Sequence, residues 1–166
     1  MGRHRRARSA WRERLGPTAR PTLWSANYLA QALGALGRPR DAIALARERL
    51  EHFRATHGDD HPGTLTSARN LFANLYALGE REQARALAED ILIRSRCVLG
   101  DDHPDTLRSA GNLAVLLAEL GEHEQARTLA EDILIRRRRV LGDDHPDTGE
   151  SSLLVQGLAQ QADESQ

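Results

Sequence analysis

The chain lacks lysine altogether, because each of its 23 basic residues is an arginine. A protein without lysine cannot form a Schiff base through a side-chain amine, and it cannot contain the phosphate-binding loop that ends in Gly-Lys-Ser or Gly-Lys-Thr. Two common kinds of enzyme site are thereby excluded. Abundant arginine and alanine without lysine are also typical of genomes rich in G and C, so we expect a bacterial source.

Cysteine is nearly absent as well, and so are long apolar runs. Cys97 is the only cysteine, which precludes an intramolecular disulfide and a structural zinc site built on cysteine pairs. No apolar stretch of about 7 to 15 residues follows the charged N-terminus, and none approaches the roughly 20 residues of a transmembrane helix. We therefore expect a cytoplasmic protein with no membrane association.

Aromatic residues make up only 4% of the chain, whereas alanine and leucine dominate its apolar fraction, and this favours closely packed helices. Residues 107–120 place apolar side chains at steps of three and four, which is typical of an amphipathic helix. Gly121 interrupts the pattern, and a second one continues to Leu141. Gly142 can then close that helix in the left-handed conformation, and Pro146 suits the first turn of the next helix.

A repeated segment orders these helices. Residues 79–106 recur as residues 121–148, with 24 of 28 positions identical after a shift of 42 residues. A fixed period of this length marks stacked supersecondary units, each of which buries its apolar face against its neighbours. The period predicts a basic N-terminal helix (1–16), in register with the second helix of a preceding repeat, then a repeat domain (17–161) and a polar tail (162–166). Within the domain, the repeats span 17–58, 59–100, 101–142 and, as a half-repeat, 143–161.

The best-defined copy carries the pattern N-L-A-x-x-L-x-x-L-G-x-x-x-x-A from Asn112 to Ala126. This pattern resembles the tetratricopeptide repeat, and the 42-residue period with the linker LGDDHPDT is similar to the long variant found in kinesin light chains and in many bacterial repeat arrays. The resemblance covers about residues 17 to 161. It implies an all-α fold, an α-α superhelix of about three and a half helix-turn-helix repeats, whose first helices line a concave groove that binds proteins.

Side chains of the first helices that do not face the core define the predicted groove. They are Trp24, Asn27, Tyr28, Gln31, Arg69, Asn70, Tyr76, Arg108, Asn112, Val115 and Glu119. The resemblance implies that Asn70 and Asn112 can bond the backbone of an extended peptide through their amides, and the alternative is that they brace their own repeats.

The remaining groove residues offer charge and apolar surface. Arg69 and Arg108 are suited to bind a carboxylate, a preference that Glu119 would locally oppose. Trp24 and Tyr28 lie four residues apart and therefore on one helix face. They either anchor an apolar side chain of a partner or pack against the preceding helix.

The linkers repeat a triplet of residue types that bind metals. The three copies are Asp59-Asp60-His61, Asp101-Asp102-His103 and Asp143-Asp144-His145. Their identical placement is what a structural turn requires, with carboxylates and imidazole satisfying the amides at helix ends. We therefore predict neither a metal site nor a cofactor.

Arginine is clustered at two places. The first 20 residues hold seven arginines against one glutamate, an arrangement that suits binding to an acidic protein or to nucleic acid, or else a solubilising end. The run from Arg136 to Arg139 falls in the last turns of a helix, where positive charge complements the macrodipole and Asp132 can pair with Arg136. We interpret that run as a solvated face, so nucleic acid is not the expected partner.

No histidine is spaced from a serine, cysteine or carboxylate as a nucleophile and its base would be, and we expect no enzymatic activity. The predicted function is that of a noncatalytic interaction module or scaffold, which holds a peptide or protein segment in its groove. Two alternatives stay open. The chain could be the C-terminal sensor part of a larger bacterial regulatory or nucleotide-dependent switch protein, or a repeat protein that forms homo-oligomers through unpaired terminal helices.

Overall fold

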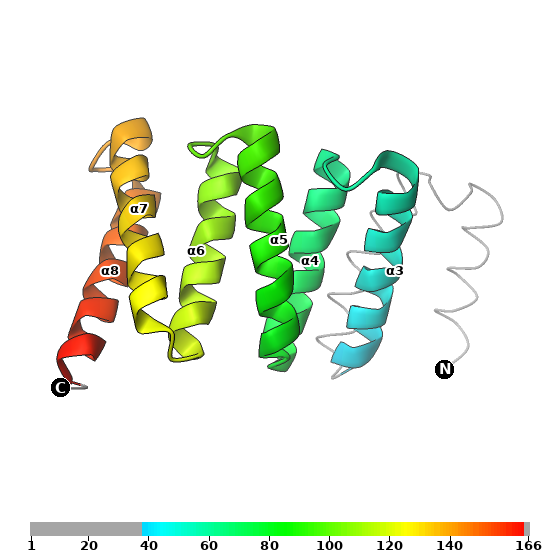
Figure 1. Cartoon of the computed structure of the whole chain (residues 1–166), viewed down its shortest axis with the longest axis horizontal. Coiled ribbons are helices and arrows are strands. Elements are labelled where there is room, and N and C mark those ends of the chain that lie inside the picture. The colour runs from blue at the N-terminus through cyan, green and yellow to red at the C-terminus, as the bar shows by residue number, and fades with distance from the viewer. Residues whose placement is uncertain (1–37, 165–166) are drawn as a thin grey trace. The chain divides into compact units, whose positions relative to one another are not determined.

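The computed structural model describes residues 38–164, and every regular element among them is a helix, as the sequence predicts (Figure 1). The helices are α3 (Pro39–His57), α4 (Pro62–Leu78), α5 (Arg81–Leu99), α6 (Pro104–Glu119), α7 (His123–Leu141) and α8 (Pro146–Glu164). They belong to two compact units that meet in sequence between Leu78 and Gly79. The predicted N-terminal helix (1–16) lies outside the described residues.

In the first unit, α3 packs along α4. The contact buries Ala42, at 1% exposure, and Leu65, at 2%. Near the loop that joins the helices, the ring of Phe53 lies against Gly63, where a Cβ atom would sit only 2.6 Å from the Phe53 Cε1 atom. A glycine is therefore required at this position as long as the ring occupies its place.

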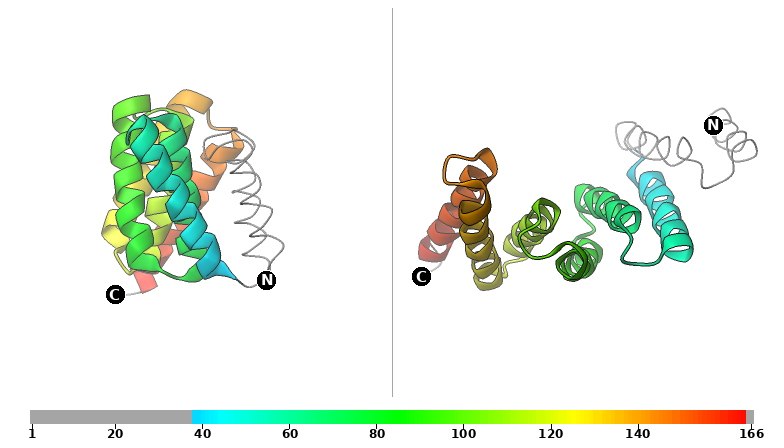
Figure 2. Two further views of the ribbon diagram at one scale, coloured as in Figure 1. Left: turned by 90° about the vertical axis from the view of Figure 1, so that its right-hand side faces the viewer. Right: turned by 90° about the horizontal axis from the view of Figure 1, so that it is seen from above.

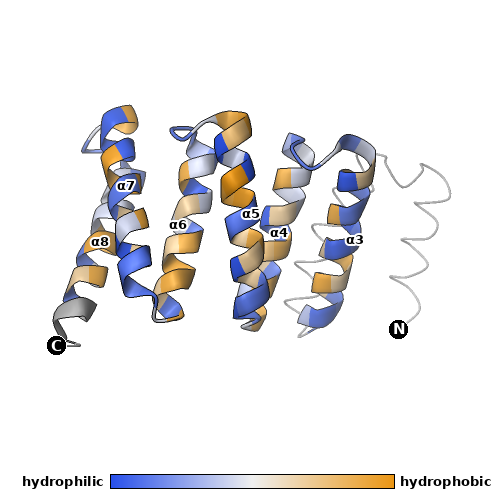
Figure 3. Cartoon of the chain, in the orientation of Figure 1, coloured by the Kyte–Doolittle hydropathy of each residue, from blue (hydrophilic) through white to orange (hydrophobic). Residues whose placement is uncertain are grey.

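In the second unit each helix packs against the next, and α6 also touches α8 (Figure 2). Ala84 and Ala126 are completely buried, which lets the helix backbones approach closely, and Leu116 is also fully buried. Leu120 and Leu129 are only half-buried. Hydrophilic and hydrophobic residues alternate along every helix, so that each has an apolar side to bury (Figure 3).

The glycines after α5 and α7 end their helices as predicted. Gly100 and Gly142 both have φ of 88°, and the amide of each donates to a carbonyl in the last turn of its helix, those of Arg96 and Arg138 respectively. A side chain at such a φ is strained. The same positive φ therefore recurs at two glycines that lie one period apart.

The linker histidines act as helix caps. The Nδ1 atoms of His61, His103 and His145 accept the backbone N–H two residues further on, at 3.0, 3.1 and 3.2 Å. An Nδ1 atom that accepts a hydrogen bond leaves the ring proton on Nε2. The imidazole thus satisfies a helix-end amide, as the sequence predicts.

The carboxylates of the second linker, by contrast, pair with arginines, which is not the capping role predicted for them. Asp101 pairs with Arg96 of the preceding helix at 3.2 Å, and Asp102 hydrogen-bonds to Arg136 of α7 at 3.1 Å. Arg139 also donates to Asp102, and its hydrogen bond is the main cause of the lowered pKa of that carboxyl group. The imidazole accepts the helix-end N–H, so the carboxylates form their charge-assisted hydrogen bonds with arginines.

Candidate functional site

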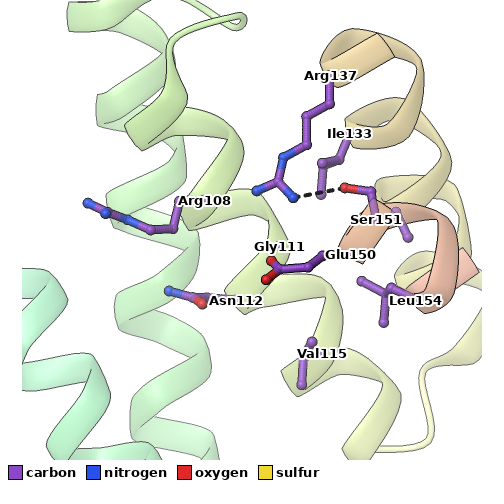
Figure 4. A pocket seen from close by; sticks show the side chains of 10 residues that line it. Arg108, Gly111, Asn112, Val115, Ile133, Arg137, Glu150, Ser151 and Leu154 are labelled. Carbon is purple, nitrogen blue, oxygen red and sulfur yellow. Dashed lines mark hydrogen bonds between the residues drawn. The ribbon is translucent and has the colours of Figure 1, made fainter. Parts of the chain in front are cut away.

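A pocket of about 230 Å³ lies in the second unit, where α6 and α8 face each other over α7 (Figure 4). Residues of three helices line it: Arg108, Gly111, Asn112 and Val115 of α6, Ala130, Ile133 and Arg137 of α7, and Glu150, Ser151 and Leu154 of α8. Its floor is apolar, and its rim carries two arginines, one carboxylate and one amide. Such a mixture suits a ligand that has an apolar side chain beside polar backbone groups.

Three of the predicted groove residues meet in this pocket. Arg108, Asn112 and Val115 follow one another at steps of four and three along α6, which places them on one side of the helix. The Asn112 side chain is half-buried and makes no hydrogen bond with the described part of the chain, whereas Arg108 is held by Asp105 at 2.6 Å. The amide of Asn112 is therefore free to bond a ligand.

Gly111 opens one wall of the pocket. It lies in the middle of α6, where glycine costs about 1 kcal/mol of helix stability relative to alanine. A Cβ atom at this position would meet nothing within 4 Å, so packing does not require glycine here. Arg69 and Leu153 occupy the equivalent positions of the neighbouring repeats. Of these three equivalent positions, only position 111 has no side chain, so the α6 backbone is accessible to a ligand there.

Arg137 corrects the interpretation of its arginine run as a solvated face. Its Nη1 atom donates to the Asp147 carbonyl at 2.7 Å and to the Ser151 hydroxyl at 2.9 Å, and the side chain is half-buried (Figure 4). Arg137 follows Ile133 by one helical turn and therefore shares its inward face. The predicted pair of Arg136 with Asp132 does form, at 2.9 Å, and it raises the pKa of Arg136.

The groove residues predicted on α4 belong to the first unit. Arg69 donates to the Thr66 hydroxyl at 3.2 Å, and the Tyr76 ring stacks on Phe72 with the ring centres 5.9 Å apart. The backbone carbonyl of Asn70 accepts a hydrogen bond from Asn74 at 2.9 Å. These three side chains stay predicted ligand contacts.

Glu119, the remaining predicted groove residue among residues 38–164, does not line the pocket. Glu119 lies at the far end of α6 and pairs with Arg81 at 3.0 Å. Trp24, Asn27, Tyr28 and Gln31 lie outside the described residues.

Sequence reasoning missed the contribution of α7 and α8 to the pocket. One signal was available, because Arg137 takes the place of Ser95 in an otherwise closely matched helix, and Leu154 takes the place of Asn112. Substitutions within a repeat that is otherwise nearly identical mark positions at which stacking does not dictate the residue. Arg137 and Leu154 both line the pocket.

The linker triplets do not form a metal site. Among residues 38–164, no group of three histidine, cysteine or carboxylate residues could hold a metal ion. The capping geometry gives a reason, because a proton on Nε2 prevents that nitrogen from coordinating a cation. Cys97 is exposed.

Within the described part of the chain, none of the helices combines the length and the apolar character that crossing a membrane would require.

Paired antiparallel helices that repeat every 42 residues and leave a lined pocket between successive first helices define an α-helical repeat protein. Sequence comparison makes the family explicit. The tetratricopeptide-repeat profile matches three consecutive segments, residues 22–63, 64–105 and 106–147. The chain belongs to the tetratricopeptide-repeat family, whose members generally mediate protein–protein interactions and are generally noncatalytic.

Solved structures of the kinesin-light-chain-like type are similar in fold. A Podosopora anserina kinesin light chain with nearly identical TPR-like repeats aligns with a TM-score of 0.76 and 25% identity, over 83% of this chain and 65% of that one. A second structure of that protein, a variant with a single substitution, aligns over 86% and 70%, with a TM-score of 0.75 and 25% identity. The chain thus spans about two thirds of the length of each.

A bacterial structure shares the same fold. BtubC (BKLC) from P. vanneervenii aligns with a TM-score of 0.78 and 20% identity, over 97% of this chain and 67% of that one. The comparison with curated proteins finds none that matches the sequence.

Proposed function

We propose that the chain is a noncatalytic interaction module that binds a segment of another protein, with the pocket between α6 and α8 as part of the binding surface. The unbonded amide of Asn112 carries this proposal. An asparagine amide can donate to a backbone carbonyl and accept from a backbone N–H, as an extended segment requires. The open backbone at Gly111 gives such a segment room to approach.

The energetics of α6 support the same function. A glycine in a helix interior destabilises the helix, and at position 111 no close contact offsets that loss. Positions that sacrifice stability without a packing reason are typical of functional surfaces. A bound segment would offset the loss by covering Val115, which is 37% exposed, and the half-buried Leu154.

The variant Gly111→Leu tests this function, because it fills the pocket with the residue that Leu153 places at the equivalent position. A library of random linear peptides displayed on phage is selected on the immobilised chain. The wild type should retain a defined set of peptides, and Gly111→Leu should retain none of that set. Its helix content, measured by circular dichroism, should be unchanged, because leucine favours a helix more than glycine does.

The matched control is Gly149→Leu, at an exposed glycine of α8 that does not line the pocket. Leu65 and Leu107 occupy the equivalent position in the other repeats, so the change suits the fold. This variant should retain the same peptides as the wild type. Retention of the full set by Gly111→Leu would show that the pocket is not the binding site, and a wild type that selects no peptide would contradict the proposed function.

A further inference from the structure

Arg137 differs from every other arginine of the second unit. Ten arginines lie between Gly79 and Glu164, and nine of them form an ion pair with a carboxylate of the chain. These are Arg81, Arg85, Arg94, Arg96, Arg108, Arg127, Arg136, Arg138 and Arg139. Within the described residues, Arg137 contacts only the Asp147 carbonyl and the Ser151 hydroxyl, both of them neutral acceptors.

The two neutral contacts hold the guanidinium group of Arg137 in place. Both engage the Nη1 atom, which leaves the donors on Nε and Nη2 without a partner in the described chain. The group is half-buried at the pocket and is directed into it from α7 (Figure 4). A fixed, partly desolvated guanidinium group binds a carboxylate more strongly than a mobile surface arginine does.

Glu150 limits what the pocket accepts. Its carboxylate lies beside Gly111 on the opposite wall, beyond ion-pair distance of Arg137, and it has no polar partner among the described residues (Figure 4). Glu150 is exposed, so a ligand carboxylate at Arg137 would share the pocket with a solvated negative charge. A second acidic group on the Gly111 side would be repelled.

We propose that Arg137 is the specificity-determining residue of the pocket and that it receives one isolated aspartate or glutamate side chain of the bound segment. Glu150 discriminates against a run of acidic residues. This inference rests on the proposed function, because it names the chemistry of the segment that the pocket binds. Arg108 is the weaker candidate, since it is 58% exposed and already pairs with Asp105.

The test measures the charge preference of selected peptides. Peptides that the wild type selects should share one acidic position, flanked by residues that are not acidic. A synthetic copy with the amide analogue at that position, Asn for Asp or Gln for Glu, should bind the wild type at least about tenfold more weakly, as expected for the loss of a charge-assisted hydrogen bond. Affinities are measured by fluorescence anisotropy.

Variants of the chain assign the effect to Arg137. Arg137→Gln should bind the acidic peptide and its amide analogue equally well, and Arg137→Glu should select lysine or arginine at the same position. Arg137→Ser introduces serine, the residue at the equivalent position 95. This variant should also bind the acidic peptide and its amide analogue equally well. Glu150→Gln should accept peptides with two neighbouring acidic residues that the wild type rejects.

The outcomes separate this inference from the proposed function. Selected peptides without a shared acidic position would overturn the role of Arg137 and leave the binding function standing. The same would follow if the amide analogue still bound more weakly than the acidic peptide to Arg137→Gln and Arg137→Ser. Failure of the wild type to select any peptide would overturn both.

Discussion

Helices α5 and α7 have nearly the same sequence but make different contacts with the helix that follows them. They are identical at 15 of 19 positions. Ser95 of α5 is completely buried, and its hydroxyl has no hydrogen-bond partner in the described chain, whereas Arg137 of α7 is half-buried and bonds two groups of α8. The exchange of Ser95 for Arg137 is one of four substitutions between the two helices, and it accompanies the change from a completely buried side chain to one that lines a pocket.

The comparison separates scaffold from site within one helix sequence. Ala84 and Ala126, Ile91 and Ile133 are equivalent pairs, and each member is at most 2% exposed. These positions stack the repeats and tolerate little change. At the substituted positions 95 and 137 the side chains differ in volume and in charge, and Arg137 bonds the first turns of the following helix.

The strongest way to break this comparison is a reciprocal exchange, Ser95→Arg and Arg137→Ser. Arginine at position 95 would desolvate a charge and overfill a site where Ser95 is completely buried, and we expect a loss of about 4 kcal/mol or more in the free energy of unfolding. Serine at position 137 leaves the pocket larger but still open to water, so the loss should stay below about 1 kcal/mol. Urea unfolding followed by circular dichroism measures both changes.

Equal losses in the two variants would contradict the difference between the interfaces. Ser95→Ala serves as the control, because it removes only a hydroxyl group that has no partner in the described chain. We expect that variant to be as stable as the wild type or slightly more stable.

A second pair of substitutions sharpens the distinction between a structural glycine and a glycine that opens the pocket. Gly111→Ala should raise the free energy of unfolding by about 0.5 to 1 kcal/mol, because alanine favours the helix and its Cβ atom meets no neighbour. Gly121→Ala should lower it by about 1 to 2 kcal/mol, because position 121 has φ of 80°. Thermal unfolding should therefore shift in opposite directions for the two variants, and a shift in the same direction would refute the distinction.

The smallest expected effect concerns acid, and it depends on Arg139, which replaces Cys97 of α5. Arg139 lowers the pKa of Asp102, mainly through their hydrogen bond. A carboxyl group with a lower pKa in the folded chain stabilises the fold above its ordinary pKa of about 3.9, and this contribution is lost as the pH falls through the folded value. Acidification should thus lower the urea midpoint more in the wild type than in Arg139→Gln.

Arg138→Gln is the control for this experiment, because Arg138 pairs with Asp143 and does not contact Asp102. If Arg139→Gln shows the same acid response as the wild type, the contact with Asp102 contributes nothing to the pH dependence. The effect should also weaken in high salt, since both side chains are largely exposed.

The sequence predicts the scaffold well because stacking repeats impose residue types at fixed steps. Gly142 closes its helix and Pro146 begins the next one, as expected from backbone geometry alone. The roles of the linker groups were harder to predict. Both a carboxylate and an imidazole can cap a helix, and the choice between them depends on where Arg96 and Arg136 reach from other helices.

The pocket was predictable only along α6. The positions of Arg108, Asn112 and Val115 follow from the helical period, because one helix face is set by local sequence. The opposite wall depends on α8, and the role of Arg137 depends on contacts with residues 10 and 14 positions further on. A periodic pattern carries no information about such contacts, because they arise from substitutions that break the period.

Phe53 and Gly63 constrain how one repeat can change into another. Later repeats hold Asp105 and Asp147 where the first unit holds Gly63, and Ser95 and Arg137 where it holds Phe53. Because a Cβ atom at position 63 would lie 2.6 Å from the ring, an aspartate at this position requires the Phe53 ring to shift or to be replaced. We therefore expect the linker of a later repeat to fit the first unit better when the helix that precedes it is transplanted as well.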